Sequence, residues 1–158
     1  MTDKYVYVTY IRTTPDRIWD ALTKPEFTRN YWFGITHEST WEAGAPWLMR
    51  FPDGRVTDSG KVLEVDRPRR LVLAWRHELT PEMKAEGDSR AVFEIEPNGD
   101  TVKLTVTHTI ENGPNFIKAV SGGWPQVLSS LKSLLETGKA LERQAACETS
   151  KALERAAQ

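Results

Sequence analysis

A stripe of apolar residues near the C-terminal end of the chain most constrains what this sequence can fold into. Within the stripe, apolar residues recur every three or four positions, the spacing that places them on one face of a helix. They are Phe116, Val120, Trp124, Val127, Leu128, Leu131, Leu134, Leu135 and Leu141. Because most of the preceding chain has the two-residue period of strands, we expect this helix to lie across a sheet.

Seven strands and two short helices are expected before the long helix. The clearest alternation runs from Val102 to Ile110 and predicts one buried and one wet sheet face. The other expected strands cover residues 5–12, 36–41, 47–51, 55–66, 70–77 and 91–96. Helices are expected at Pro15–Leu22 and Pro25–Tyr31, since proline suits the first helical position. Leu79–Asp88 is polar and is expected to be a mobile loop with at most one helical turn.

This order predicts an α+β fold in which a curved antiparallel sheet of about six to seven strands wraps around the C-terminal helix. We expect a single domain over residues 1–141. Residues 142–158 are rich in alanine and balanced in charge, and we expect either a helical extension or a disordered tail there. The space between sheet and helix is either packed core or a pocket.

Composition narrows the class of protein. The 158 residues include 21 basic and 22 acidic ones, and a net charge of -1 argues against a nucleic-acid partner. No apolar run approaches the ~20 residues that span a bilayer, so no membrane partner is expected. The first residues resemble no secretory signal, and the single cysteine, Cys147, fits a reducing cytoplasm. The sequence leaves monomer and homodimer open.

Three segments resemble a known family. They are Ile11–Glu26, Gly60–Trp75, and Gly123-Trp124 followed by Leu128, Leu131 and Leu135. Over roughly residues 5–141 the chain resembles the START-like (SRPBCC) superfamily, in particular the bacterial subfamily homologous to the activator of the heat-shock chaperone ATPase. The resemblance implies a helix-grip fold with a hydrophobic ligand cavity under the last helix. Its name implies a possible chaperone partner and a role in the stress response.

A set of aromatic and apolar side chains is expected to line that cavity, with two histidines among them. The set is Trp32, Trp41, Trp47, Met49, Phe51, Val62, Trp75, His77, Phe93, His108, Trp124, Leu128 and Leu131. Large ligand pockets are mostly apolar with a few placed polar groups. The alternative is that these side chains form a packed core.

The two histidines of this set, His77 and His108, are the catalytic candidates. On their strands both are expected to face the cavity, where a histidine could act as a general acid or base. Alternatively, both are buried structural residues. With His37 they show no close metal-ligand spacing, so we expect neither a metal nor a cofactor.

Two carboxylates on the long strand 55–66 are further candidates. Asp58 and Glu64 have the same parity as Val62, so all three are expected to face inward. A buried acid has a raised pKa and could serve catalysis. Alternatively, each carboxylate pairs with a surface arginine, such as Arg50 or Arg76.

The long helix carries an interruption at residues 121–125, where two glycines and a tryptophan precede Pro125. Proline lacks a backbone donor and crowds the carbonyl four residues earlier, and the residue before it avoids helical angles. We therefore expect a short segment at Pro114–Val120 and a main helix from Trp124 to Leu141. Trp124 would point into the cavity from this joint, which we expect to be the entrance.

The leading functional prediction is a protein that binds a small hydrophobic or aromatic ligand without catalysis. The first alternative is an enzyme of the cyclase, dehydratase or hydrolase type that uses a cavity histidine with a carboxylate. The second alternative is a chaperone-associated stress-response protein.

Overall fold

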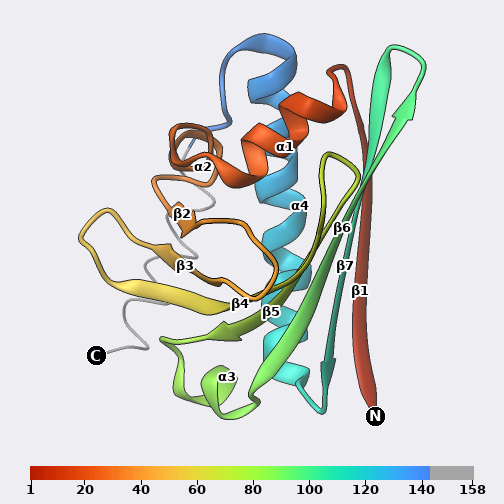
Figure 1. Cartoon of the computed structure of the whole chain (residues 1–158). Coiled ribbons are helices and arrows are strands. Elements are labelled where there is room, and N and C mark those ends of the chain that lie inside the picture. Colours follow the sequence, from red (N-terminus) through yellow and green to blue (C-terminus); the bar gives the residue numbers. More distant parts are fainter. Residues whose placement is uncertain (143–158) are drawn as a thin grey trace.

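The computed structural model describes residues 1–142, and the predicted tail lies outside these residues except for Glu142. The elements follow the predicted order (Figure 1). They are β1 (Thr2–Ile11), α1 (Pro15–Thr23), α2 (Pro25–Tyr31), β2 (Thr36–Ser39), β3 (Pro46–Arg50), β4 (Val56–Asp66), β5 (Arg70–His77), α3 (Pro81–Ala85), β6 (Asp88–Asn98), β7 (Thr101–Glu111) and α4 (Pro114–Thr137).

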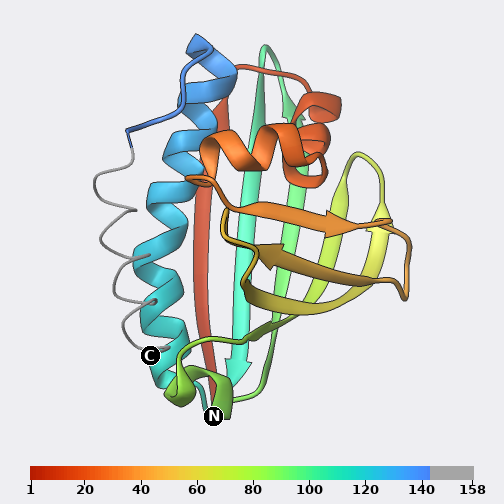
Figure 2. The ribbon, with the colours of Figure 1, turned by 90° about the vertical axis from the view of Figure 1, so that its left-hand side faces the viewer.

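The strands form one seven-stranded sheet in the order β1-β7-β6-β5-β4-β3-β2, and every neighbouring pair is antiparallel. The sheet curves around α4, which runs beside β1 and β7 (Figure 2). Helices α1 and α2 lie over one end of the sheet and α3 lies at the other (Figure 1). The predicted helix-grip architecture is confirmed.

The core lies between the concave sheet face and α4. On β7, alternate residues from Val102 to Ile110 are buried, as their period predicts. From α4, Phe116, Trp124, Leu128 and Leu131 are buried against the sheet. The helix therefore closes the open side of the sheet along its whole length.

The predicted break in the last helix is wrong, because α4 is continuous through Pro125. A proline inside a helix costs about 3 kcal/mol. Buried side chains before and after it, such as Phe116 and Leu128, hold both halves of α4 on one core. This packing outweighs the local preference, since tertiary contacts supply most of the stability of a helix.

The helix also ends earlier than predicted. Gly138 adopts the left-handed conformation (φ 84°), and its N–H donates to the carbonyl of Leu134 at 2.9 Å. A left-handed glycine is a common helix C-cap. The chain then turns back, and the N–H of Leu141 donates to the Ser130 hydroxyl at 3.2 Å.

The prediction that Asp58 and Glu64 share a face is wrong for Glu64. The pairing of β4 with β5 shifts register between Val62 and Glu64, which makes Leu63 an extra, bulged residue. A bulge of one residue reverses the alternation beyond it. Asp58 is therefore buried, whereas Glu64 is exposed and forms an ion pair with Arg70.

Candidate binding pocket

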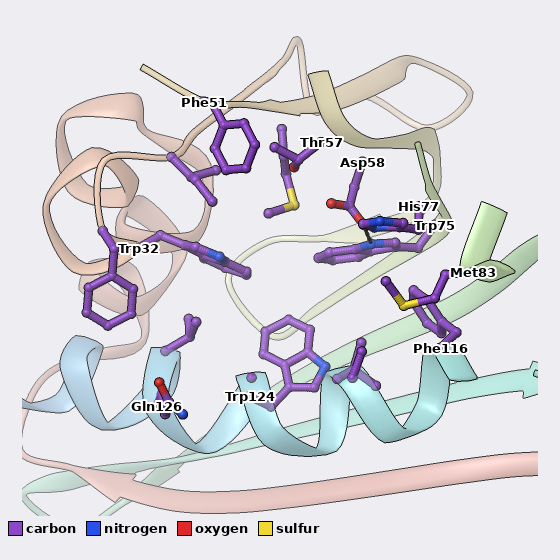
Figure 3. Close-up of a pocket in the computed structure, with 17 residues that line it drawn as sticks. Trp32, Phe51, Thr57, Asp58, Trp75, His77, Met83, Phe116, Trp124 and Gln126 are labelled. Atoms are coloured by element: carbon purple, nitrogen blue, oxygen red, sulfur yellow. Dashed lines mark hydrogen bonds and ion pairs between the residues drawn. The ribbon is translucent and has the colours of Figure 1, made fainter. Parts of the chain in front are cut away.

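A pocket with a volume of about 160 Å³ lies between α4 and the sheet (Figure 3). The helix contributes Phe116, Ala119, Val120, Gly123, Trp124, Gln126 and Val127. The strands and the segments that follow them contribute Met49, Phe51, Thr57, Asp58, Trp75 and His77. The remaining wall comes from Trp32, Phe33 and Ile35 after α2 and from Met83 of α3. Most of these side chains are apolar, as in typical small-molecule sites.

The structure brings together about half of the predicted ligand-binding set. Trp32, Met49, Phe51, Trp75, His77 and Trp124 line the pocket. Trp41, Trp47, Val62, Phe93, His108, Leu128 and Leu131 do not. Apart from the half-buried Trp41, the members of the second group are packed in the core behind the pocket wall. For these positions the packed-core alternative describes the structure.

Three tryptophans form the centre of the pocket wall. The ring centroid of Trp32 lies 5.4 Å from that of Trp124 and 6.5 Å from that of Trp75. The rings of Trp75 and Trp124 lie 5.7 Å apart in an edge-to-face arrangement. Aromatic pairs at these separations stabilise one another beyond their buried area. These contacts hold the three rings together as one wall of the pocket.

The polar part of the pocket is built on Asp58. Its Oδ2 accepts a hydrogen bond from the Trp75 indole at 2.7 Å and lies 3.3 Å from Nδ1 of His77 (Figure 3). Asp58 and His77 are directly opposite in the β4–β5 pairing, and His77 follows Trp75 on the same strand face. Antiparallel pairing thus brings three side chains from two strands to one point.

This geometry fixes the tautomer of His77. An ionised carboxylate only accepts hydrogen bonds, so Nδ1 of His77 carries the hydrogen that it donates to Asp58. In the neutral imidazole, Nε2 then presents a lone pair. His77 is 4 % exposed, and its Nε2 is buried without a hydrogen-bond partner among the described residues. The wall of the pocket therefore contains an unused acceptor.

His108 lies behind the wall, and both of its ring nitrogens are engaged. Its Nδ1 accepts a hydrogen bond from the Trp124 indole at 3.1 Å, so Nε2 carries the hydrogen and donates to Ser89 Oγ at 2.8 Å. The Ser89 hydroxyl in turn donates to the Trp75 carbonyl at 2.9 Å. Burial lowers the pKa of His108 to about 4. This histidine connects α4 to the sheet and has no nitrogen left for a ligand.

The third histidine, His37, packs on the ring of Trp32 with a centroid distance of 4.4 Å. Burial lowers its pKa to about 3, with a smaller opposing effect from the charge of Asp58. Within residues 1–142, no group of three or more His, Cys, Asp or Glu side chains could hold a metal ion.

The arginines considered as partners of the inward acids lie elsewhere. Arg50 pairs with Glu38 at 2.8 Å, and Arg76 lies 3.9 Å from Glu78. Asp58 therefore has the ring N–H groups of Trp75 and His77 as partners, whereas these two arginines belong to the surface.

The sequence did not predict several pocket residues, because their positions depend on local irregularities of the strands or on tertiary packing. Thr57 is the extra residue of a second bulge in β4, since Met49 pairs with Asp58 and Arg50 with Val56. Met83 comes from the segment expected to be a mobile loop with at most one helical turn, and it lies in the short helix α3 that forms there. The apolar helical stripe could have indicated Phe116, which belongs to the face that α4 buries.

A family model described as Activator of Hsp90 ATPase homolog 1-like protein matches residues 12–136. No curated protein matches the chain in sequence. Within the described part of the chain, no helix is both long enough and apolar enough to span a bilayer.

Solved structures share the fold at low sequence identity. Protein MLL2253 from Mesorhizobium loti has a TM-score of 0.72 and 20% identity, covering 84% of this chain and 96% of that chain. The Aha1 dimer from Colwellia psychrerythraea has a TM-score of 0.69 and 20% identity, covering 87% of this chain and 99% of that chain. PFC0360w, an HSP90 activator from Plasmodium falciparum, has a TM-score of 0.68 and 18% identity, covering 84% and 95%.

Proposed function

From the premise that the chain belongs to the family of Activator of Hsp90 ATPase homolog 1-like proteins, we propose that it binds a small apolar or aromatic molecule in the pocket under α4. The observation that carries this proposal is the tryptophan wall formed by Trp32, Trp75 and Trp124. Burying a ligand ring against such a wall removes apolar surface of both partners from water, which favours binding.

The size of the pocket limits the ligand. A dry apolar cavity of about 150 Å³ is known to hold benzene. The pocket volume here is about 160 Å³, which corresponds to a single-ring compound or a short branched chain. Larger ligands would extend past the helix side of the pocket, where Ala119 is exposed.

Isothermal titration with p-xylene tests the proposal, because this probe has one ring and no polar group. A plugged variant, Gly123→Leu, supplies the comparison. Gly123 lines the pocket, and a Cβ added there meets no heavy atom within 4 Å, so the new side chain fills free space. Gly122→Leu is the matched control, since Gly122 also has free space but does not line the pocket.

We expect saturable binding of p-xylene to the natural sequence and to Gly122→Leu, and at least a tenfold loss of affinity in Gly123→Leu. Equal affinities in both glycine variants would place the probe outside the pocket. If neither p-xylene nor another single-ring hydrocarbon gives saturable heat, the proposed function is contradicted.

An enzymatic function is the second candidate, and the Asp58–His77 pair favours it. A carboxylate that holds Nδ1–H of a histidine leaves Nε2 free to accept a proton, as in acid–base enzymes. The reaction class would be a cyclisation, dehydration or hydrolysis of an apolar substrate with His77 as the base. Turnover that is lost in His77→Phe but kept in a His108 variant would support it, whereas equal turnover in His77→Phe would contradict it.

Association with a heat-shock chaperone is carried by the family description alone. The ATPase rate of the host chaperone, measured with and without saturating protein, decides it, because an activator raises that rate.

A further inference from the structure

The polar end of the pocket has two buried groups whose hydrogen-bonding capacity is unused. His77 Nε2 and Thr57 Oγ1 have no hydrogen-bond partner among the described residues. The side chain of His77 is 5 % exposed, and Thr57 is 2 % exposed. Both residues line the pocket, on the side where Asp58 projects from β4 (Figure 3). Buried polar groups are usually paired, so two unpaired groups in residues that line one pocket point to a ligand.

The chemistry of these groups selects a class of ligand. Neutral His77 offers a lone pair at Nε2 and needs a donor, whereas the Thr57 hydroxyl both donates and accepts. A ligand hydroxyl matches this pair, because it donates one hydrogen bond and accepts another. A ligand carboxylate does not match, since it only accepts and would lie near the buried Asp58 carboxylate.

We infer that the pocket takes an apolar ring or short chain that carries one hydroxyl group, which donates to His77 Nε2 and accepts from Thr57 Oγ1. This inference rests on the proposed function and makes it specific. The tryptophan wall holds the apolar body, and Asp58 acts as a positioning residue because it fixes which nitrogen of His77 is free. The ligand class is therefore that of simple phenols and alicyclic alcohols.

Three single-ring probes of similar shape separate the effects of a ligand donor, a ligand acceptor and the apolar ring on affinity. They are p-cresol, which has a hydroxyl, 4-methylanisole, which has an oxygen acceptor but no donor, and p-xylene, which has neither. Titrations at pH 8 keep p-cresol and an ordinary histidine neutral. Because the probes differ in their own hydrophobicity, the readout is the affinity ratio of p-cresol to each other probe, compared between protein variants.

The variants are His77→Phe, which keeps a ring but removes the acceptor, and Thr57→Val, which replaces the hydroxyl with a methyl group of similar size. Ile117→Val is the control, since it changes a half-buried apolar residue that does not line the pocket. We expect His77→Phe to reduce the preference for p-cresol over both other probes about tenfold, the effect of leaving one buried hydrogen-bonding group unpaired. Thr57→Val should reduce the preference for p-cresol over p-xylene by a similar factor but not that over 4-methylanisole, whose oxygen also accepts. Ile117→Val should leave both preferences unchanged.

Unchanged preference for p-cresol in His77→Phe would overturn the inference, and in Thr57→Val it would overturn the part assigned to Thr57. If His77→Phe fails to fold, nitrogen NMR of the natural protein gives the answer. A change of the Nε2 shift of His77 with p-cresol, but not with 4-methylanisole, is the expected result, and no change overturns the inference. Binding of all three probes with no preference contradicts only this inference, whereas binding of none contradicts the proposed function.

Discussion

The hydrogen bond from Trp124 to His108 should contribute strongly to stability, and Trp124→Phe tests it. This change keeps an aromatic ring on α4 but removes the N–H that donates to His108 Nδ1 at 3.1 Å. His108 is fully buried, so water cannot replace the lost donor without a rearrangement. If His108 moves its hydrogen to Nδ1, that hydrogen has no acceptor, and either tautomer leaves one ring nitrogen unpaired.

Two effects determine how much Trp124→Phe lowers the free energy of unfolding. A buried acceptor left unpaired costs about 1–3 kcal/mol. The smaller ring also leaves space beside Trp32 and Phe93, which adds about 1–2 kcal/mol. We therefore expect the free energy of unfolding to fall by about 3 kcal/mol, and the Tm to fall by about 6–12 °C for a chain of this length.

Urea unfolding, followed by circular dichroism at pH 8, measures this loss directly. Trp41→Phe is the matched control, because Trp41 is half-buried and does not line the pocket. It should cost less than about 1 kcal/mol, as expected for a position outside the core. A loss below about 1 kcal/mol in Trp124→Phe, or equal losses in the two variants, would refute the reasoning.

Three further predictions concern pH, the helix and a close backbone approach. Because burial lowers the pKa of His37 to about 3 and that of His108 to about 4, the unfolded chain binds more protons below pH 6.5. Stability should be constant above that pH and should fall by up to about 1.4 kcal/mol per pH unit and histidine between pH 6 and pH 4. Urea unfolding across this range checks the slope, which His37→Phe should reduce; a flat profile would contradict both assignments. Pro125→Ala restores a helical N–H donor inside α4 and should raise the free energy of unfolding by about 1–3 kcal/mol, and a loss of stability would show that the proline is favourable there. Gly60→Ala should prevent folding, because its Cβ would overlap the carbonyl of the facing strand, whereas Gly122→Ala should stabilise α4 by about 0.5–1 kcal/mol. Comparable thermal melts for these two alanine variants would contradict the close approach.

The sequence predicted the architecture well because the elements have strong periods. The alternation on β7 and the apolar stripe on α4 each identify one buried face, and a curved sheet around one helix buries both. The first two helices begin at the predicted prolines, Pro15 and Pro25. The end of α4 was harder to predict, since it depends on the left-handed Gly138 rather than on the apolar residues of the helix.

The pocket was less predictable, because periodicity gives the face of a residue and not its depth in the core. Trp47 and Trp75 both face inward, yet only Trp75 lines the pocket, while the Trp47 indole donates to the Ala74 carbonyl at 2.8 Å. Bulges in β4 also changed the expected faces of Thr57 and Glu64. A one-residue insertion in a strand has no reliable sequence signature, because its two residues look like ordinary strand residues.

The three clustered tryptophans make the pocket visible to optical spectroscopy. Indole rings whose centroids lie 5.4 to 6.5 Å apart couple their electronic transitions, so they give paired bands of opposite sign in ultraviolet circular dichroism. The sign and size of such bands depend on the mutual orientation of the rings, which are edge-to-face for Trp32 with Trp124 and for Trp75 with Trp124. A molecule that enters the pocket and turns one ring would change these bands without any label. The ultraviolet circular dichroism of these tryptophans should therefore report directly on what enters the pocket.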